Sequence, residues 1–538
     1  MSELRQIDRA PDGPLSRMRA RAISLRGAKA GLLAMLAGGA ANLAHAPFFL
    51  WPALVLALWV LFWQIGAAAE EPRRWRAGFW RGWCFGTAYF LGGTYWIGSA
   101  FLVAPERHAI YMPFAVAAMA TGLGLFWGAA GAIAARYWPD RGPKQAVWLG
   151  FWLFAAEFAR GHAFGGFPWH LPGAIWPAGG AMSQVAAYVG LYGLSALTLL
   201  VFLVPAGLAD GRNDGFGRKI AFAIGAVALL VGGGIAGANR LKPADIDESK
   251  RIALGETGVS QRDKWRPDNR SNVISQYLRL LEAPNAADAQ IIVWPEGALP
   301  TLLLEDPVAI DGIAERLGAR MLIVGATRRD VDANGDGIAF NSLAVLRNSD
   351  SGLRLDHVYD KHRLVPFSEI VPLSGLFKAI GFEGFAAIAG GFTPGPRPRS
   401  LQLANGVRIA PLICYEALFP GLTPRGPDRP DWIVNISNDS WFGVTTGPPQ
   451  HFNQARYRAI EEGLPMIRSA SGGLSAIIDP YGRVTQAMPN PSVVAAAPPE
   501  SLPPTIYSRF GRVLLLLLTI LIFFYGLPGK TNRALARP

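Results

Sequence analysis

The chain has 538 residues, of which 51% are hydrophobic and 17% charged, and its mean hydropathy is +0.23. This balance is too apolar for an ordinary soluble enzyme of this length and predicts a protein that crosses a membrane. The net charge of +12 does not indicate a nucleic-acid partner, because the basic residues cluster in short segments beside apolar ones.

Eight apolar segments are candidates for transmembrane helices, each of which needs about 20 apolar residues. Seven of them form a predicted membrane bundle over residues 30–240, at 30–44, 48–69, 78–103, 110–135, 145–159, 182–209 and 220–237. The eighth, at 513–525, lies within a predicted C-terminal helix over 512–528. The first segment follows several arginines, as a secretory signal would. No small-residue cleavage site follows it, so we expect it to be retained.

Basic residues alternate between the loops of this bundle. Residues 1–29 and 529–538 are predicted basic tails, and the loops near 73–76, 141–144 and 212–219 also carry arginine or lysine. The intervening loops carry few, with Arg107 the main exception. Because basic loops stay in the cytoplasm, both tails are predicted there. The insert between the last two spans is then outside, in the periplasm of a Gram-negative cell, and the predicted location is the bacterial inner membrane.

This insert, residues 241–508, has ordinary polarity and alternates short strands with helices. The predicted strands are 251–254, 291–294, 321–325, 342–346, 353–358, 407–414, 432–436 and 476–479, and the predicted helices are 269–282, 307–317 and 450–462. Such a mixture predicts a layered α/β domain with a site at the ends of its central strands.

Three residues in this domain have the chemistry of acyl transfer. Cys414 and Glu296 each follow an apolar run, and Lys361 follows the predicted strand at 353–358. Alone, the cysteine would more often be a small buried hydrophobe, and the other two would be solvated surface charges. Together they supply a nucleophile, a base and a cation, which favours catalysis through a thioester. The only other cysteine, Cys84, lies in an apolar run rich in glycine and tryptophan and is not expected to pair with Cys414.

The order Glu296, Lys361, Cys414 resembles the nitrilase, or carbon–nitrogen hydrolase, superfamily, whose fold is an αββα sandwich. Five runs in order within an eight-span chain resemble the apolipoprotein N-acyltransferase family: 294–296, 359–369, 413–416, 438–443 and 450–461. The chain departs from the family at Ser368, where glycine is usual. It also departs near residues 471–473 and at 256–258, where Glu-Thr-Gly replaces Gln-Gly-Asn.

The resemblance implies a ping-pong reaction. Cys414 takes the sn-1 acyl chain of a phospholipid, typically phosphatidylethanolamine, and passes it to the α-amino group of the N-terminal diacylglyceryl-cysteine of an apolipoprotein. Glu296 would act as the base and Lys361 would stabilise the oxyanion. The resemblance assigns supporting or substrate-binding roles to Glu369, Tyr415, Glu416 and Trp265. For Trp265, a packed aromatic residue is the alternative.

We expect no cofactor and no metal, and a monomer whose partners are lipids and lipoproteins. The run 332–337 matches the first half of a calcium loop, but Leu343 stands where the loop needs glutamate, so a hairpin turn is predicted. Three other functions stay open: a membrane-tethered amidase, a transporter with an appended domain, and an inactive binding module. The transporter would need ionisable residues within its spans, and Glu157 and His45 are the only obvious candidates.

Overall fold

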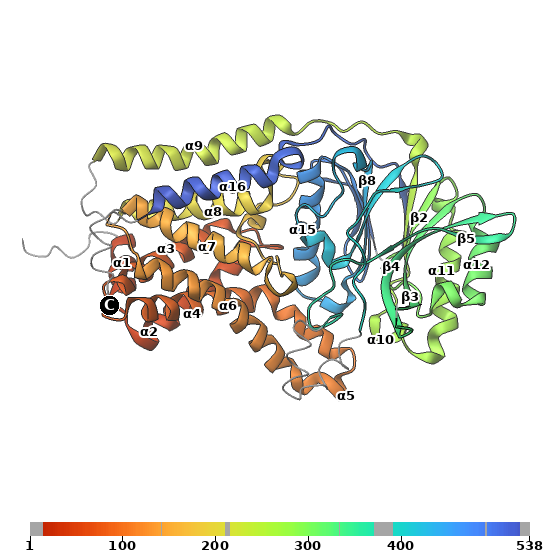
Figure 1. The fold of residues 1–538 in the computed structure, drawn as a ribbon, viewed down its shortest axis with the longest axis horizontal. Coiled ribbons are helices and arrows are strands. Elements are labelled where there is room, and N and C mark those ends of the chain that lie inside the picture. The colour runs from red at the N-terminus through yellow and green to blue at the C-terminus, as the bar shows by residue number, and fades with distance from the viewer. Residues whose placement is uncertain are drawn as a thin grey trace, which may run out of the picture.

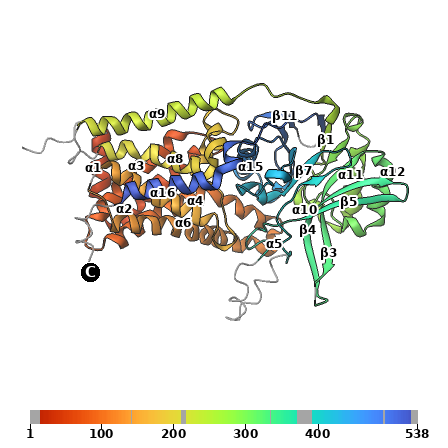
Figure 2. The same ribbon diagram turned by 45° about the horizontal axis from the view of Figure 1, so that its top comes forward.

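A computed structural model describes residues 14–140, 142–209, 216–332, 334–370, 391–489 and 492–527. A bundle of long helices forms one end of the molecule, and a domain of two stacked sheets forms the other (Figures 1 and 2). Residues 1–13 and 529–538 of the predicted tails lie outside the described residues, as do residue 528 of the predicted C-terminal helix and residues 141 and 212–215 of two predicted basic loops. The rest of the N-terminal tail is not an extended tail, because helix α1 occupies Pro14–Ser24 and buries Ala22 against the bundle.

Each predicted apolar segment coincides with a helix. The long helices are α2 (Gly27–Ala41), α3 (Trp51–Ala69), α4 (Arg74–Thr94), α6 (Met112–Arg136), α7 (Gly142–Arg160), α8 (Ala186–Ala209), α9 (Phe216–Arg240) and α16 (Ile506–Gly526). Helix α4 ends earlier than predicted, and the 3-10 helix η2 (Tyr95–Leu102) follows it. The short helix α5 (Pro105–His108) comes next. Helix α16 begins before the predicted segment, at Ile506.

Five stretches are long and apolar enough to cross a membrane: Trp51–Ala69, Pro105–Arg136, Met182–Leu208, Ile220–Arg240 and Ile506–Gly526. The prediction of eight spans is therefore supported for five. Helix α2 has only 15 residues, and α4 and α7 contain charged side chains. These charges are satisfied inside the bundle: Arg81 donates to the Gln64 carbonyl at 2.6 Å, and Glu157 pairs with Arg160. Burial between helices explains how charge is accommodated in an otherwise apolar bundle.

Glycines let α4 and α6 pack closely. A Cβ atom on Gly82 would lie 2.4 Å from the Trp127 carbonyl oxygen, and one on Gly78 would lie 2.4 Å from the Gly131 oxygen. Both contacts are closer than a side chain permits, so the two backbones touch where the sequence places glycine at every fourth residue of α4. This is the small-residue packing typical of membrane helices.

The predicted α/β sandwich is present. One sheet has the order β12-β1-β2-β3-β4-β5 and the other β11-β10-β9-β8-β7-β6. The strands are β1 (Ile252–Glu256), β2 (Ile291–Val293), β3 (Met321–Val331), β4 (Gly337–Ser349), β5 (Gly352–Asp360), β6 (Leu401–Gln402), β7 (Arg408–Ile413), β8 (Trp432–Asn438), β9 (Met466–Ser471), β10 (Ser475–Ile478), β11 (Val484–Met488) and β12 (Ser492–Ala496). Strands β6, β9, β11 and β12 were not predicted. Strand β9 is buried along its whole length and shows no polar alternation for a pattern to detect.

Helices cover the outer face of each sheet. Helices α11 (Arg270–Leu281) and α12 (Pro307–Leu317) pack on the first sheet through an apolar cluster that includes Tyr277 and Trp294. The cores of the two sheets meet in a second cluster that contains Cys414. Helix α15 (Gly447–Glu462) covers the second sheet and lies between it and the membrane bundle (Figure 1).

Helix α15 also joins the two parts of the molecule. Its Tyr457 and Ile460 belong to the apolar cluster of the bundle. Its Glu461 accepts a hydrogen bond of 2.7 Å from the backbone N–H of Leu191, where α8 is interrupted at Gly190 (φ +72°). The sandwich domain is thus seated on the bundle by both packing and a buried carboxylate.

The two chain segments that link the sandwich to the bundle run together. Strands β1 and β12 are antiparallel neighbours at one edge of their sheet. Beyond them, residues 246 and 499 form a bridge, and the backbone N–H of Glu500 donates to the Asp245 carbonyl at 2.8 Å. The domain therefore begins and ends at the same place.

Candidate active site

The predicted catalytic residues sit at strand ends. Strand β2 leads to Glu296, and β7 leads to Cys414. In each sheet the central strands run parallel, β1-β2-β3 in one and β7-β8-β9 in the other. Because functional groups gather at the carboxyl ends of parallel strands, the two stacked sheets direct both residues to one place. Lys361 follows β5, the last strand of the first sheet.

Cys414 adopts an unusual backbone conformation. Its φ is +48°, in the left-handed region, where the chain leaves β7 and enters the 3-10 helix η11 (Cys414–Leu418). Such a conformation costs a non-glycine residue about 1–3 kcal/mol and is found where the surroundings enforce it. The thiol is nearly buried. Burial, together with the negative charge of Glu296, raises the pKa of Cys414, and the charge of Lys361 only partly opposes this. The resting thiol is therefore protonated and needs a base.

Lys361 is the cation of the site. Its Nζ lies 2.9 Å from Glu369 Oε1 and 3.5 Å from Glu296 Oε1, and the side chain is 1% exposed. Burial alone would lower the pKa of Lys361, but the carboxylates of Glu296 and Glu369 outweigh it and raise the pKa above its usual value. The two carboxylates therefore favour the charged ammonium form of Lys361. Its charge also acts on the thiol of Cys414.

Asn341, in the middle of β4, completes the group. Its amide Nδ2 donates to Glu296 Oε1 at 2.6 Å and to Glu369 Oε1 at 2.9 Å. The second oxygen of Glu296 accepts from the backbone N–H of Asn438 at 2.8 Å, and that of Glu369 accepts from the N–H of Val365 at 2.8 Å. Both carboxylates are thereby fixed on either side of one ammonium. We call Glu296, Asn341, Lys361 and Glu369 the front network.

Comparison with known proteins shows the family. Residues 37–204 match the apolipoprotein N-acyltransferase N-terminal domain, and residues 258–497 match the carbon-nitrogen hydrolase family. A protein named apolipoprotein N-acyltransferase from Caulobacter vibrioides is 39% identical over 508 residues, which cover 91% of this chain and 92% of the relative. The chain belongs to the apolipoprotein N-acyltransferase family. A member from Rhodopseudomonas palustris is 36% identical over 534 residues, covering 96% of this chain and 98% of that protein.

Membership in the apolipoprotein N-acyltransferase family confirms the resemblance inferred from the five sequence runs, including the nitrilase-like domain. It also accounts for the two parts of the molecule, since one matched region falls in the helical bundle and the other in the sandwich.

The next two predicted residues hold the turn at Cys414 in place. Glu416 is buried and accepts hydrogen bonds from the Tyr359 hydroxyl (2.6 Å) and from three backbone N–H groups, at positions 362, 363 and 413 (2.7–3.0 Å). It thus ties the Lys361 loop to the turn at Cys414. Burial raises the pKa of Glu416. The hydroxyl of Tyr415 donates to the Gly166 carbonyl at 2.6 Å, which anchors the same turn to a loop of the bundle.

Trp265 is not packed in the core. It follows the short helix α10 (Gln261–Lys264) and is 54% exposed, so its side chain is available to a substrate. The preceding residue, Lys264, is fully buried and was not predicted as part of the site. Its Nζ donates to the carbonyl of Gly297, directly after Glu296, at 3.1 Å and to Ser471 Oγ at 3.0 Å. Lys264 therefore secures the turn that carries Glu296.

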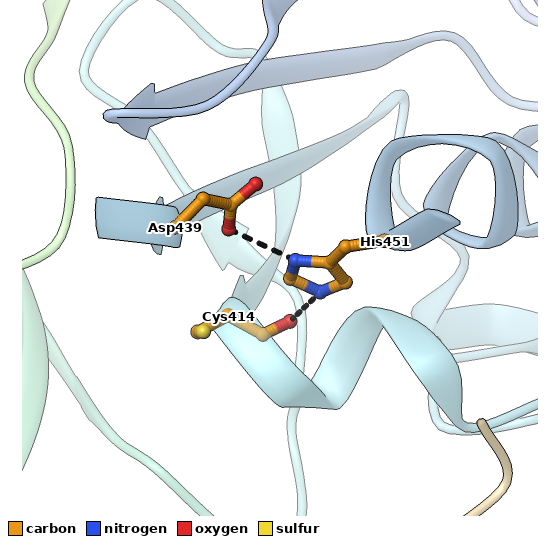
Figure 3. A group of neighbouring side chains, drawn as sticks. All are labelled: Cys414, Asp439 and His451. Atoms are coloured by element: carbon orange, nitrogen blue, oxygen red, sulfur yellow. Dashed lines mark hydrogen bonds and ion pairs between the residues drawn. The ribbon is translucent and has the colours of Figure 1, made fainter. Parts of the chain in front are cut away.

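A second buried group lies beside the backbone of Cys414 (Figure 3). His451 Nδ1 is 2.9 Å from Asp439 Oδ1, and its Nε2 is 3.3 Å from the carbonyl oxygen of Cys414. Arg468 pairs with Asp439 Oδ2 at 2.7 Å and also donates to Asn435. Since a carbonyl only accepts, Nε2 must carry a proton. We call Asp439, His451, Arg468 and Asn435 the rear network.

The rear network is hydrogen-bonded to the backbone of Cys414 and not to its thiol. Figure 3 shows the sulfur pointing away from the imidazole. One donor atom from each of Cys414, Asp439 and His451 lies within 4.8 Å of the others, which is close enough to hold a metal ion. Both imidazole nitrogens and the carboxylate are already engaged, however, and a cation there would meet the fixed charge of Arg468. The arrangement fits a structural support better than a metal centre.

Sequence reasoning missed most of this support. Asp439 and His451 lie in two of the runs that carry the family resemblance, so a signal existed for them. Asn341, Lys264 and Arg468 are single polar residues within ordinary strand or helix sequences, and only the folded arrangement shows their contacts.

Proposed function

We propose that this chain transfers an acyl chain from a membrane phospholipid to the N-terminus of lipoproteins through a thioester at Cys414. The donor is phosphatidylethanolamine, and the acceptor is the free α-amino group of an N-terminal diacylglyceryl-cysteine. The observation that carries the proposal is the buried group of Glu296 and Lys361 beside the strained Cys414, in a nitrilase-like domain seated on apolar helices.

In the first half-reaction the thiol attacks the sn-1 ester carbonyl. Glu296 takes the thiol proton as the C–S bond forms, which is needed because burial keeps the thiol protonated. Lys361 and a backbone N–H after Cys414 stabilise the oxyanion of the tetrahedral intermediate. The ester C–O bond then breaks, and Glu296 returns the proton to the departing lysophospholipid oxygen.

In the second half-reaction the acceptor amine attacks the thioester. A C–N bond forms and the C–S bond breaks, so the products are an N-acyl amide and a thiolate. Glu296 takes one proton from the attacking nitrogen and delivers it to Cys414, which regenerates the resting thiol. The same base thus serves both half-reactions, and Glu369 holds Lys361 between them.

The bundle of apolar helices places the site at the membrane, where the lipid substrates are. A soluble domain would have to lift an acyl chain out of the bilayer at a cost of about 0.8 kcal/mol per CH₂ group. A site held directly on membrane helices avoids that cost. We propose a monomer in the bacterial inner membrane. Its domain boundaries lie at residues 241 and 508, and its catalytic domain is in the periplasm.

Incubation of the purified protein with phosphatidylethanolamine alone tests the thioester. The intact mass should increase by one acyl group, and hydroxylamine at neutral pH should remove it. The Cys414→Ala variant should show no increase. An adduct that persists in Cys414→Ala, or release of free fatty acid by the wild type without any acyl-enzyme, would contradict the proposal.

Phosphatase fusions test the orientation. A reporter inserted within residues 244–499 should be active, and one placed after residue 537 should be inactive. The opposite pattern would reverse the proposed topology without affecting the chemistry.

A further inference from the structure

Several arginines gather around one short segment beside the nucleophile, residues 419–421. The guanidinium of Arg363 lies over the ring of Phe419, 5.2 Å from its centre. Arg397 donates to the carbonyl of Gly421. The guanidinium of Arg425 is 3.8 Å from the position that a Cβ atom on Gly421 would occupy. Three loops of the catalytic domain thus bring positive charge to the same place.

Helix α16 adds a fourth arginine from the membrane side. Tyr507, in its first turn, lies against the guanidinium of Arg425, 4.9 Å from the ring centre. Arg512 follows on the same helix. Burial lowers the pKa of Arg397, and the charges of Arg512, Arg363 and Arg425 lower it further. The guanidinium of Arg397 is therefore repelled by the other three.

This positive charge is only partly balanced. Arg425 pairs with Glu462. Among the residues that the structure describes, no carboxylate lies within ion-pair distance of Arg363, Arg397 or Arg512, and Arg363 Nε is buried without a hydrogen-bond partner. Like charges held together around a partly buried point are unfavourable unless an anion joins them. The cluster therefore has the character of an anion site.

The cluster lies next to the reacting thiol. The backbone N–H of Arg363 donates to Glu416 Oε1 at 3.0 Å, and Glu416 is in the 3-10 helix that begins at Cys414. The rings of Tyr415 and Phe419 are 5.1 Å apart. On its other side the cluster meets the first turns of α16, an apolar helix long enough to cross a membrane. An anion bound here would lie between the nucleophile and the lipid.

We propose that Arg363, Arg397 and Arg512 bind the phosphodiester of the donor phospholipid while its acyl ester reaches Cys414. Guanidinium groups match the geometry and charge of phosphate oxygens. The inference rests on the proposed function and deepens it, because recognition of a phosphate would distinguish the acyl donor from the acceptor. The donor carries a phosphate, whereas the diacylglyceryl group of the acceptor carries none. The cluster is thus specific to the first half-reaction.

The test compares two acyl donors that differ in the phosphate. Arg363→Gln, Arg397→Gln and Arg512→Gln are made in the full-length protein, and acyl-enzyme formation is measured with phosphatidylethanolamine and with a p-nitrophenyl ester of the same acyl chain. Each variant should raise the apparent KM for phosphatidylethanolamine by about tenfold, as expected for loss of one charged hydrogen bond. The change should be several-fold smaller with the p-nitrophenyl ester. Arg279→Gln, an exposed arginine on α11, is the matched control and should change neither.

The other outcomes are equally clear. Equal losses with both donors would indicate a structural role and overturn the inference, as would unchanged KM values in all three variants. A comparable loss in transfer from the preformed acyl-enzyme to a diacylglyceryl peptide would also overturn it. Inorganic phosphate that competes as well as phosphatidylethanolamine would show a site for free anions and not for a lipid. Failure of the wild type to form any acyl-enzyme would instead contradict the proposed function.

Discussion

Cys414 lies between two buried polar networks that differ in the atom they serve. The front network places one ammonium between two carboxylates, and the charges of Lys361 and Glu296 act on the thiol. The rear network is hydrogen-bonded to the carbonyl oxygen of the same residue, through His451, and Asp439 adds a smaller electrostatic effect on the thiol. Charges of the front network thus act on the thiol of Cys414, and a hydrogen bond from the rear network fixes its backbone. The two networks come from different secondary-structure elements.

The two networks also differ in how completely their negative and positive charges are balanced. The front network has two negative groups and one positive group, so a proton can be accommodated on a carboxylate during the reaction. In the rear network, Asp439 accepts from Ser437 and Arg468, and its Oδ1 lies 2.9 Å from His451 Nδ1. Burial opposes ionisation of Asp439, but Arg468 and His451 hold its pKa far below the usual range. The front network therefore has an excess of carboxylates, whereas the carboxylate of the rear network is paired with a buried guanidinium.

The largest effect should come from the front network. Lys361→Met removes the ammonium that pairs with both Glu296 and Glu369 and should slow acyl-enzyme formation by about 10²-fold or more, as for loss of an oxyanion donor. Lys361→Arg should fail as well, because a planar guanidinium does not replace a compact ammonium in a buried site. Single-turnover mass spectrometry measures the rate. Near-normal acylation by Lys361→Met would remove the lysine from the mechanism.

The rear network should matter for stability first. Asp439→Asn leaves the buried charge of Arg468 unpaired and should destabilise the protein by about 3 kcal/mol. The pKa of Asp439 is depressed in the folded state, so its contribution is fully present above its unfolded pKa and is lost as the pH falls through the folded value. Thermal unfolding at pH 7 therefore shows the full difference. A variant as stable as wild type but unable to form the acyl-enzyme would place Asp439 in the chemistry instead.

Glu369→Gln should have a milder effect. The glutamine can still accept the Val365 N–H, but Lys361 loses one of its two carboxylate partners. We expect acylation to slow by about tenfold, corresponding to one hydrogen bond with a charged group. Glu296→Gln is the comparison in the same assay. If both variants are equally impaired, Glu369 also transfers protons and the front network has two bases.

Cys84→Ala should have the smallest effect. Cys84 is buried in α4, where its sulfur would lie 3.1 Å from a Cβ atom on Gly31 in α2. Removing a sulfur from this packed position should leave acyl-enzyme formation near the wild-type rate. The variant also provides a protein with one thiol for labelling. Loss of the acyl-enzyme in Cys84→Ala would question the assignment of the nucleophile.

The sequence predicted the parts of the site that repeat a local pattern. Apolar runs ending in Glu296 and Cys414 indicated strand ends, and apolar length located each helix of the bundle. Local patterns could not show Asn341, which reaches the site from the middle of β4 only because β4 and β5 pair. Composition alone also could not predict the number of spans. Arg81 places a charge within α4, and only the structure shows that this charge is hydrogen-bonded between helices.

Strands β1 and β12 lie side by side, and the segments beyond them pair as they leave the sandwich. A domain whose two ends coincide can be inserted into a loop of another protein without separating the elements on either side. The sandwich therefore has the architecture of an inserted domain, placed in the chain of the helical bundle between α9 and α16. This arrangement lets the inserted domain diversify or be exchanged as a unit. The replacement domain must then offer a surface that packs on the bundle as α15 does.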